Sequence, residues 1–391
     1  PMRVKRTAAL PFLIAAVLVV VSGCSGTPDG RNATPEPAAA PTVTPAPAPV
    51  DPVAEWVDER MSAMTLDQKA AALLMLHAPG VDAAPLRALV DAGASGLILM
   101  GDNMPGDPAT LASLAAATTA DSSCPPLIGI DQEGGEVQRL PWDAAASAET
   151  LRSEPVAATR DAFAARAAAV AGSGATVNFG IVADVTADPE SFIFGRVLGT
   201  DPAGSAERVA AAVSGERGVV ASTLKHFPGH GAAPGDSHTS IPSAPLSLDE
   251  WRASAALPFA AGIDAGAELV MTSHVAYPAV DAAPASLSPA WHRVLRDELG
   301  FDGVVVTDDM LMLQHNGLPE YADPGENAVR AVAAGADLLL YVLPADPSTF
   351  GISIPGLVAS LTTAVQSGRI APDRLDEAVA HVLTLRRSLA V

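Results

Sequence analysis

The sequence predicts a single (β/α)₈ barrel, in which a ring of eight parallel strands is surrounded by helices. Two observations lead to this fold. Eight short, continuously apolar runs alternate with helical stretches within residues 51–391, and such runs are typical of parallel strands that are buried on both faces. Polar residues follow most of these runs directly, which places them at the carboxyl ends of the strands, where barrels of this class gather their functional groups.

The expected strands are Leu73–His77, Gly96–Met100, Leu127–Asp131, Thr176–Val182, Ser222–His226, Glu268–His274, Gly303–Asp308 and Asp337–Val342. Stretches of helical length and composition lie between them, for example Asp107–Ala120, Ala206–Ser214, Leu248–Ala265 and Pro289–Leu299. Thr65 and Gln68 have the spacing of a capping box and predict a helix start, and Asp373–Leu389 predicts a terminal helix. A doubly wound open sheet would have the same alternation, so periodicity alone does not separate the two folds.

The polar residues at the strand ends favour the barrel over the open sheet. Six of the eight runs end in a polar cluster or lead directly into one. These clusters are His77, Asp131-Gln132-Glu133, Asp184, Lys225-His226, Ser273-His274 and Thr307-Asp308-Asp309. In a closed barrel the strand ends converge on one face, whereas in an open sheet they would be spread along an edge. Convergence is the simpler interpretation.

The amino-terminal residues predict a targeting segment. Three basic residues precede the apolar run Ala8–Val21, and the small residues Ser22-Gly23 then precede Cys24. Residues 1–24 therefore have the order of a signal peptide, and its end resembles the lipobox of bacterial lipoproteins, in which the cysteine is acylated. An uncleaved membrane anchor is the alternative, but the apolar run is short for a span of roughly 20 residues.

Residues 25–50 consist largely of proline, alanine and threonine. Such a segment cannot bury enough apolar surface to fold, so we expect a disordered tether between the lipid anchor and the barrel of residues 51–391. The expected location is the extracytoplasmic face of the cell membrane. The formal net charge of −21 argues against nucleic acid as a partner, because phosphate binding needs lysine and arginine.

The loop after the fifth strand is dense in chemically active residues, in a chain with only eight histidines. One interpretation is a metal site with four candidate ligands, His226, His230, Asp236 and His238, although no HExxH-like helical pairing is present. In the other interpretation, Lys225 and His226 hydrogen-bond a substrate hydroxyl. Asp236 then orients His238, which acts as a general acid and base.

Two further segments carry candidate functional residues. Asp308 and Asp309 follow the seventh strand, where only one of two successive side chains can face a pocket; the alternative is that both cap the following helix. Gly134-Gly135 lies between Asp131 and Arg139 and allows a turn with positive φ or a close backbone approach. The segment lacks the patterns of a phosphate-binding loop.

Taken together, the segments Ile130–Leu140, Lys225–His238 and Val305–Met310 resemble glycoside hydrolase family 3. Within that family they are similar to the single-domain bacterial β-N-acetylglucosaminidases of peptidoglycan recycling. The run KHFPGHG followed by DSH is the most specific signal, DQEGG is less specific, and the similarity extends from about Val53 to the C-terminus. The resemblance implies a (β/α)₈ barrel, a retaining mechanism and no metal or organic cofactor.

The resemblance also implies roles for individual residues. The nucleophile falls on Asp308. Relatives with two domains bring an acid/base carboxylate from the second domain, whereas the single-domain subfamily uses a histidine with an aspartate partner. We expect this chain to belong to the second group, with His238 and Asp236 in those positions. The implied sugar contacts are Asp131, Arg139, Arg196, Lys225 and His226.

Two departures from the family pattern bear on specificity. Arg196 is followed by Val197-Leu198 where the family usually has serine and phenylalanine, and Glu136 occupies a position that often holds a basic or small residue. The expected function is an exo-β-N-acetylglucosaminidase that acts on peptidoglycan-derived fragments, such as GlcNAc-containing muropeptides. The alternatives are a β-glucosidase or β-xylosidase of the same family, a metal-dependent hydrolase, and a non-catalytic sugar-binding lipoprotein.

Overall fold

The computed structural model describes residues 51–390. The predicted signal peptide, the predicted lipidation site Cys24 and the tether of residues 25–50 lie outside the described residues. Within residues 51–390, no helix has both the length and the apolar composition that crossing a membrane requires.

Eight parallel strands form one nearly closed sheet in the order β10-β1-β2-β3-β4-β5-β6-β9. They are β1 Leu74–Leu76, β2 Gly96–Leu99, β3 Leu127–Ile130, β4 Val177–Val182, β5 Ala221–Phe227, β6 Leu269–Thr272, β9 Val304–Thr307 and β10 Leu339–Tyr341. A parallel bridge joins Val306 of β9 to Leu338, which directly precedes β10. The two edges of the sheet therefore meet, and the barrel prediction is confirmed, while the open doubly wound alternative is wrong.

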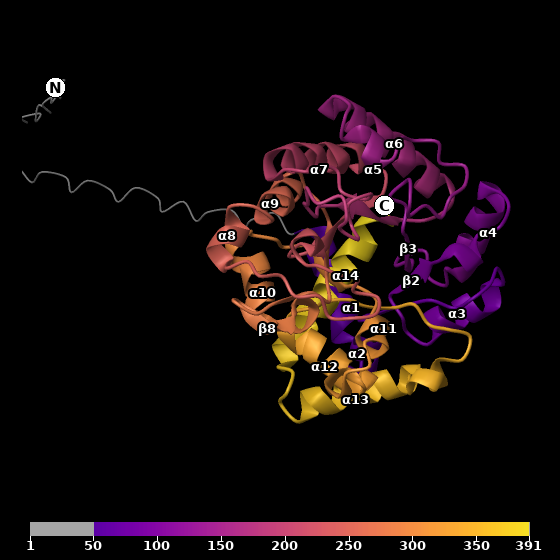
Figure 1. Cartoon of the computed structure of the whole chain (residues 1–391). Helices are drawn as coiled ribbons and strands as arrows, with labels where there is room; N and C mark the ends of the chain where they lie inside the picture. Colours follow the sequence, from indigo (N-terminus) through magenta and orange to yellow (C-terminus); the bar gives the residue numbers. More distant parts are fainter. Residues whose placement is uncertain (1–50, 391) are drawn as a thin grey trace, which may run out of the picture. The chain divides into compact units, whose positions relative to one another are not determined.

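The helices surround the strands, which occupy the centre of Figure 1. They are α1 Pro52–Ser62, α2 Leu66–Ala71, α3 Ala83–Asp91, α4 Pro108–Thr118, α5 Ala148–Leu151, α6 Val156–Gly172, α7 Pro202–Glu216, α8 Leu248–Arg252, α9 Ala256–Asp264, α10 Pro289–Arg293, α11 Leu311–His315, α12 Pro324–Ala334, α13 Ile354–Gln366 and α14 Pro372–Ser388. A five-residue π-helix, Val294–Glu298, continues α10. Short 3₁₀ turns occur at Gly101–Asn103, His230–Ala232, Ala285–Leu287, Pro319–Tyr321 and Pro347–Phe350.

Most of the expected elements lie within two residues of their predicted bounds, but α7 begins four residues before the helix expected over residues 206–214, and two further features differ. The expected helix over residues 248–265 is divided into α8 and α9. Pro258 explains the division, because it has no amide hydrogen and its ring would clash with the carbonyl of residue 254 in a continuous helix. The structure also contains a short antiparallel pair, β7 Ala276–Tyr277 and β8 Asp281–Pro284, that the sequence did not predict. The capping box at Thr65 and Gln68 is present, with both reciprocal hydrogen bonds.

The interior of the barrel is filled by side chains from alternate strand positions. Met75, Phe179 and Val306 belong to this inner cluster, whereas the strand neighbours Leu74, Leu76 and Val305 belong to outer clusters that include helix residues, as strand alternation requires. Gly129 lies on the inner face of β3. A Cβ at this position would meet the ring of Phe179 at 2.5 Å, so the glycine makes room for the aromatic ring.

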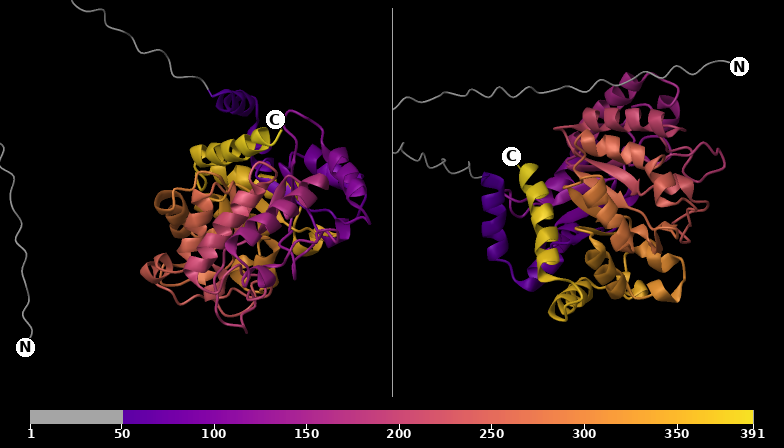
Figure 2. Two further views of the ribbon diagram at one scale, coloured as in Figure 1. Left: turned by 90° about the horizontal axis from the view of Figure 1, so that it is seen from above. Right: turned by 90° about the vertical axis from the view of Figure 1, so that its left-hand side faces the viewer.

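Helix α14 covers the end of the barrel at which the strands begin. Its residues Val382 and Leu385 pack with the inner cluster. Arg386 donates to Ser95 Oγ at 3.0 Å and to Pro125 O at 2.9 Å, and these residues precede β2 and β3. Helices α1 and α14 lie side by side (Figure 2). This end of the barrel is therefore closed by α14.

Glu216, at the end of α7, places a carboxyl group in the interior. The side chain is fully buried and accepts a hydrogen bond of 2.6 Å from Asn178 Nδ2 on β4. Burial disfavours the ionised form and raises the pKa of Glu216 to about 8. Glu216 is therefore protonated in the folded protein at neutral pH.

We expect the stability of the protein to fall as pH rises from 4.5 through about 8, because the folded state binds a proton at Glu216 that an unfolded chain, with a pKa near 4.5, has released. The variant Glu216→Gln cannot ionise and should lack this dependence. Between about pH 5 and about pH 8.5, the free energy of unfolding of the wild type should fall, relative to the variant, by more than about 1.4 kcal/mol, the equivalent of one pKa unit. Denaturant unfolding at several pH values measures both curves, and parallel curves would contradict the assignment.

Candidate active site

A cavity of about 300 Å³ opens at the carboxyl ends of the strands. Seven of the eight residues predicted to act in catalysis or sugar binding line it: Asp131, Arg139, Arg196, Lys225, His226, His238 and Asp308. These side chains follow β3, β4 and β9 or belong to β5 and the loop after it. The closed ring of parallel strands brings them together, as expected for this fold.

Lys225, near the end of β5, is the centre of the charged floor of the cavity. Its side chain is 3% exposed, and its Nζ contacts Asp131 Oδ1 at 2.9 Å and Glu133 Oε1 at 2.7 Å. Burial alone would lower the pKa of Lys225, but the two carboxylates outweigh it and raise the pKa. Burial alone would raise the pKa values of Asp131 and Glu133, but the charge of Lys225 outweighs burial and lowers both pKa values. All three groups are therefore charged at neutral pH.

Arg196 adds a second cation to this network. Its guanidinium binds Glu133 through two hydrogen bonds, Nε to Oε2 at 2.9 Å and Nη2 to Oε1 at 2.7 Å. This planar two-point contact fixes the position of the arginine. Val197 and Leu198, which depart from the family pattern, are buried beneath the loop. The departure therefore falls on core-facing residues and leaves Arg196 in the cavity.

His226 is oriented from both sides of its ring. Its Nδ1 lies 2.7 Å from Asp184 Oδ2, and Arg196 Nη2 lies 3.3 Å from its Nε2. Nδ1 is the donor in the contact with Asp184, because a carboxylate oxygen can only accept. Asp184 is fully buried and also accepts from the backbone N–H of His230 at 2.6 Å. Burial would raise the pKa of Asp184, but His226 outweighs burial and lowers it.

The loop that carries Arg139 is held by a buried scaffold. Gln132 Oε1 accepts from the backbone N–H groups of Arg139 and Leu140, both at 2.9 Å. Arg166 on α6 is fully buried and pairs with Asp143 of the same loop at 2.9 Å. A Cβ at residue 134, where φ is +82°, would overlap the Arg166 guanidinium. The predicted need for glycine in this turn is thus confirmed.

Asp308 faces the cavity from the end of β9. Burial alone would raise the pKa of its carboxyl. The imidazoles of His226 and His274, together with the adjacent backbone N–H and the Lys225 ammonium, outweigh burial and lower the pKa. The Asp309 N–H donates to Asp308 Oδ1 at 2.8 Å. Asp308 is therefore an ionised carboxylate at neutral pH.

The neighbouring Asp309 has a structural role. Its Oδ1 accepts from the backbone N–H groups of Leu311 at 3.1 Å and Val342 at 3.0 Å, which ties the start of α11 to the end of β10. Burial raises the pKa of Asp309 to about 7. Asp309 thus joins two segments of the backbone, although the N-cap residue of α11 is Met310, whereas Asp308 is the carboxylate that faces the cavity.

The rim of the cavity carries the pair formed by Asp236 and His238. The side chain of His238 is 58% exposed, and its Nδ1 lies 2.6 Å from Asp236 Oδ1. Burial would raise the pKa of Asp236, but hydrogen bonds from the backbone and ring of His238 lower it. Asp236 itself does not line the cavity. It contacts the ring of His238, which is the partner that the sequence indicated for it.

A smaller hollow of about 150 Å³ adjoins the cavity and shares five residues with it, Asp131, Arg139, His238, Met271 and Asp308. Its remaining wall is mainly apolar, with Met100, Met312 and Leu340 among its members. Asp308 therefore lies between a charged region and an apolar one.

The candidate metal ligands do not form a metal site. Within residues 51–390, no group of three or more histidine, cysteine, aspartate or glutamate side chains has the arrangement of one. His226 binds Asp184, His230 Nε2 lies 3.1 Å from Ser237 Oγ, and His238 binds Asp236. Each imidazole is thus engaged in a separate hydrogen bond.

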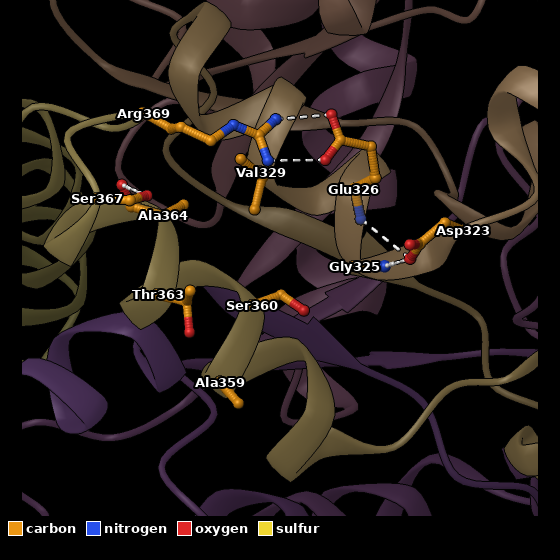
Figure 3. A pocket seen from close by; sticks show the side chains of 10 residues that line it. All are labelled: Asp323, Gly325, Glu326, Val329, Ala359, Ser360, Thr363, Ala364, Ser367 and Arg369. Atoms are coloured by element: carbon orange, nitrogen blue, oxygen red, sulfur yellow. Dashed lines mark hydrogen bonds and ion pairs between the residues drawn. The ribbon is translucent and has the colours of Figure 1, made fainter.

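A hollow of about 360 Å³ lies elsewhere on the surface, between α12 and α13 (Figure 3). Its charged side chains are already occupied. Glu326 and Arg369 form a two-point ion pair at 2.6 and 2.9 Å, and Asp323 caps the first turn of α12. This hollow also contains none of the residues that the sequence predicted for catalysis or sugar binding.

The sequence indicated no role in the site for Glu133, Asp184 or Phe192, and it suggested His230 only as a candidate metal ligand. Glu133 and Asp184 belong to the polar clusters at the strand ends, but their sequence context indicates no specific role. The signal for Glu133 was its place within the segment that also supplies Asp131 and Arg139. The contacts of Phe192 depend on loop geometry, for which the sequence holds no local signal.

The chain is a (β/α)₈ barrel, and one cavity at its strand ends is lined by an ionised carboxylate, buried cations and an imidazole. This arrangement is typical of enzymes with this fold. More narrowly, the chain belongs to glycosyl hydrolase family 3, because the model of the family's N-terminal domain matches residues 65–385.

Several proteins similar to this chain are named as hexosaminidases or β-N-acetylglucosaminidases. The chain is 42% identical over 210 residues to the Beta-hexosaminidase of Stenotrophomonas maltophilia (strain R551-3), which is 51% of this chain and 62% of that protein. Among solved structures, a glycoside hydrolase family 3 β-N-acetylglucosaminidase from Paenibacillus sp. str. FPU-7 is similar with a TM-score of 0.77 and 33% identity, over 84% of this chain and 64% of that one. The β-N-acetylhexosaminidase from Beutenbergia cavernae DSM 12333 has a TM-score of 0.71 and 31% identity, over 83% of this chain and 98% of that one. The chain thus spans less than two thirds of the first two proteins.

We expect Lys225→Met to destabilise the protein by about 3–5 kcal/mol, because it leaves the buried carboxylates of Asp131 and Glu133 without their shared cation. Lys69→Met is the matched control. Lys69 pairs with Asp376 at 2.6 Å, but that carboxylate is 45% exposed, so its loss should cost no more than about 1 kcal/mol. Denaturant unfolding of both variants measures the difference, and equal losses would contradict the central role of Lys225.

Proposed function

We propose that the protein is a retaining exo-β-N-acetylglucosaminidase that removes terminal GlcNAc from peptidoglycan-derived fragments. The observation that carries the proposal is the pairing of an ionised carboxylate on the cavity floor, Asp308, with an imidazole–carboxylate pair on the rim, His238 and Asp236. The names of the relatives, which are hexosaminidases and β-N-acetylglucosaminidases, support the choice of sugar.

In the first half-reaction, Asp308 attacks the anomeric carbon of the bound sugar while the His238 imidazole protonates the departing glycosidic oxygen. The C–O bond to the leaving group breaks and a covalent glycosyl-enzyme forms. In the second half-reaction, His238 removes a proton from water, which attacks the anomeric carbon and releases Asp308. Two displacements give net retention of configuration.

The electrostatics of the site suit these roles. A nucleophilic carboxylate must be ionised, and the lowered pKa of Asp308 meets this requirement at neutral pH. Asp236 accepts from Nδ1 of His238 and leaves Nε2 to face the substrate, which is the orientation that proton transfer requires. The two groups have different surroundings, since one lies on the cavity floor and the other is exposed at the rim.

Lys225, Asp131, Arg139, Arg196 and His226 would bind the hydroxyl groups of the sugar. Their mutual hydrogen bonds hold them in place before the substrate arrives, so little reorganisation is needed when charge develops at the anomeric centre. A cavity of about 300 Å³ is at the lower end of the range of roughly 300–1,000 Å³ for small-molecule sites. This size favours one terminal sugar over an extended chain.

We expect Asp308→Asn to lower kcat/KM by at least three orders of magnitude, or about 4 kcal/mol, because the amide cannot form the glycosyl-enzyme. Asp309→Asn is the matched control, since its amide oxygen can still accept from Leu311 and Val342; its loss should stay below about tenfold. Hydrolysis of 4-nitrophenyl β-GlcNAc measures both variants. If Asp308→Asn kept substantial activity, Asp308 could not be the nucleophile.

We also propose that a lipid on Cys24 anchors the protein to the extracytoplasmic face of the cell membrane, on the basis of the lipobox-like residues that precede this cysteine. In a bacterial host that processes lipoproteins, radiolabelled palmitate should enter the wild type and should be absent from Cys24→Ala. Equal labelling of the two proteins would exclude this anchor.

A further inference from the structure

The imidazole of His238 is held by few groups. Its backbone N–H and its Nδ1 both contact Asp236 Oδ1, at 2.9 and 2.6 Å, so these hydrogen bonds come from the same loop two residues away. The side chain is 58% exposed. These contacts orient the ring relative to its loop, but they do not connect the loop tip to the rest of the barrel.

Phe192 provides such a connection. This residue lies between β4 and α7, and its ring packs against His238 in a T-shaped arrangement with 5.6 Å between ring centroids. T-shaped contact is a preferred geometry for aromatic pairs. Phe192 is 37% exposed and lines the cavity, whereas the other exposed large hydrophobic side chains of residues 51–390 lie away from it.

The segment that carries Phe192 is firmly attached to the barrel. Arg196 forms the two-point contact with buried Glu133, and Ile193 is fully buried. The guanidinium of Arg152 donates to Phe194 O at 2.5 Å. Phe192 therefore projects to the cavity rim from a fixed support, which a positioning group requires.

The same ring also contacts the base of the histidine loop. Phe192 and His230 have ring centroids 5.5 Å apart at an interplanar angle of 44°. His230 is buried, and its Nε2 lies 3.1 Å from the Oγ of Ser237, the residue before His238. Phe192 thus packs against the loop at two points, one at the rigid base and one at the exposed tip.

We propose that Phe192 is a positioning residue, whose ring holds the His238 imidazole at the cavity rim where it can transfer a proton to the leaving-group oxygen. The inference rests on the proposed function, because it assigns Phe192 to the protonation step of that reaction. Phe192 acts through His238 and takes no part in the displacement by Asp308.

Two aryl substrates of similar shape separate this role from a simple stacking surface. Phenyl β-GlcNAc has a poor leaving group that needs protonation, whereas 4-nitrophenyl β-GlcNAc leaves readily without it. We expect Phe192→Ala to lower kcat/KM about tenfold or more on the phenyl substrate, a fraction of the 10²–10⁴-fold that general acid catalysis contributes, and less than about threefold on the nitrophenyl substrate. The loss should appear in kcat rather than in KM. The variant Phe192→Tyr, which keeps an aromatic ring at this position, should retain the activity of the wild type.

His238→Ala and Leu257→Ala are the reference variants. His238→Ala should show the same selectivity for leaving group as Phe192→Ala, and more strongly. Leu257 is similarly exposed, at 39%, but it does not line the cavity, so Leu257→Ala should leave both rates unchanged. On the phenyl substrate, the double variant of Phe192 and His238 should be no slower than His238→Ala alone, because coupled residues are non-additive.

Equal losses on the two aryl substrates, or a further loss in the double variant, would overturn the positioning role and assign Phe192 to leaving-group stacking. Failure of the wild type to hydrolyse either β-GlcNAc substrate would instead contradict the proposed function itself. The two failures are therefore distinguishable in one set of measurements.

Discussion

The site depends on a lysine ammonium that is buried where the barrel strands end. Lys225 is 3% exposed, and removing such a charge from water is costly unless carboxylates surround it. Asp131 and Glu133 meet this need from the segment after β3, and Glu133 in turn binds Arg196 from the loop after β4. The paired ammonium of Lys225 thus connects β5 with the segments that follow β3 and β4. The same ammonium helps to lower the pKa of Asp308.

The cavity combines a rigid floor with an exposed rim. On the floor, side chains are buried and bind one another, so their dipoles and charges are oriented before a ligand enters. Burial raises the pKa of Asp309, whereas at Asp308 the side chains of His226, His274 and Lys225 outweigh burial and lower the pKa. At the rim, His238 is exposed and depends on Asp236 and Phe192 for its orientation. This combination of a rigid floor and an exposed rim suits a reaction in which the nucleophile is fixed in position and the proton donor lies at the entrance through which the substrate binds.

The sequence predicted the strands well because each is a short apolar run buried on both faces, a pattern with few alternatives. It also predicted which strand ends would meet, because a closed barrel brings them together. Pairings between loops could not be predicted. Nothing local indicates that Glu133 reaches Arg196 across 63 residues, or that Phe192 packs on His238. The break between α8 and α9 was predictable in principle from Pro258, since proline cannot continue a helix beyond its first turn.

The most direct measurement is covalent trapping with a fluorinated GlcNAc analogue that carries a good leaving group, followed by peptide mapping of the inactivated protein. We expect stoichiometric labelling of Asp308 and, with natural substrate, a product that keeps the β configuration when first released. A label on any other residue, or release of the α-anomer, would contradict it.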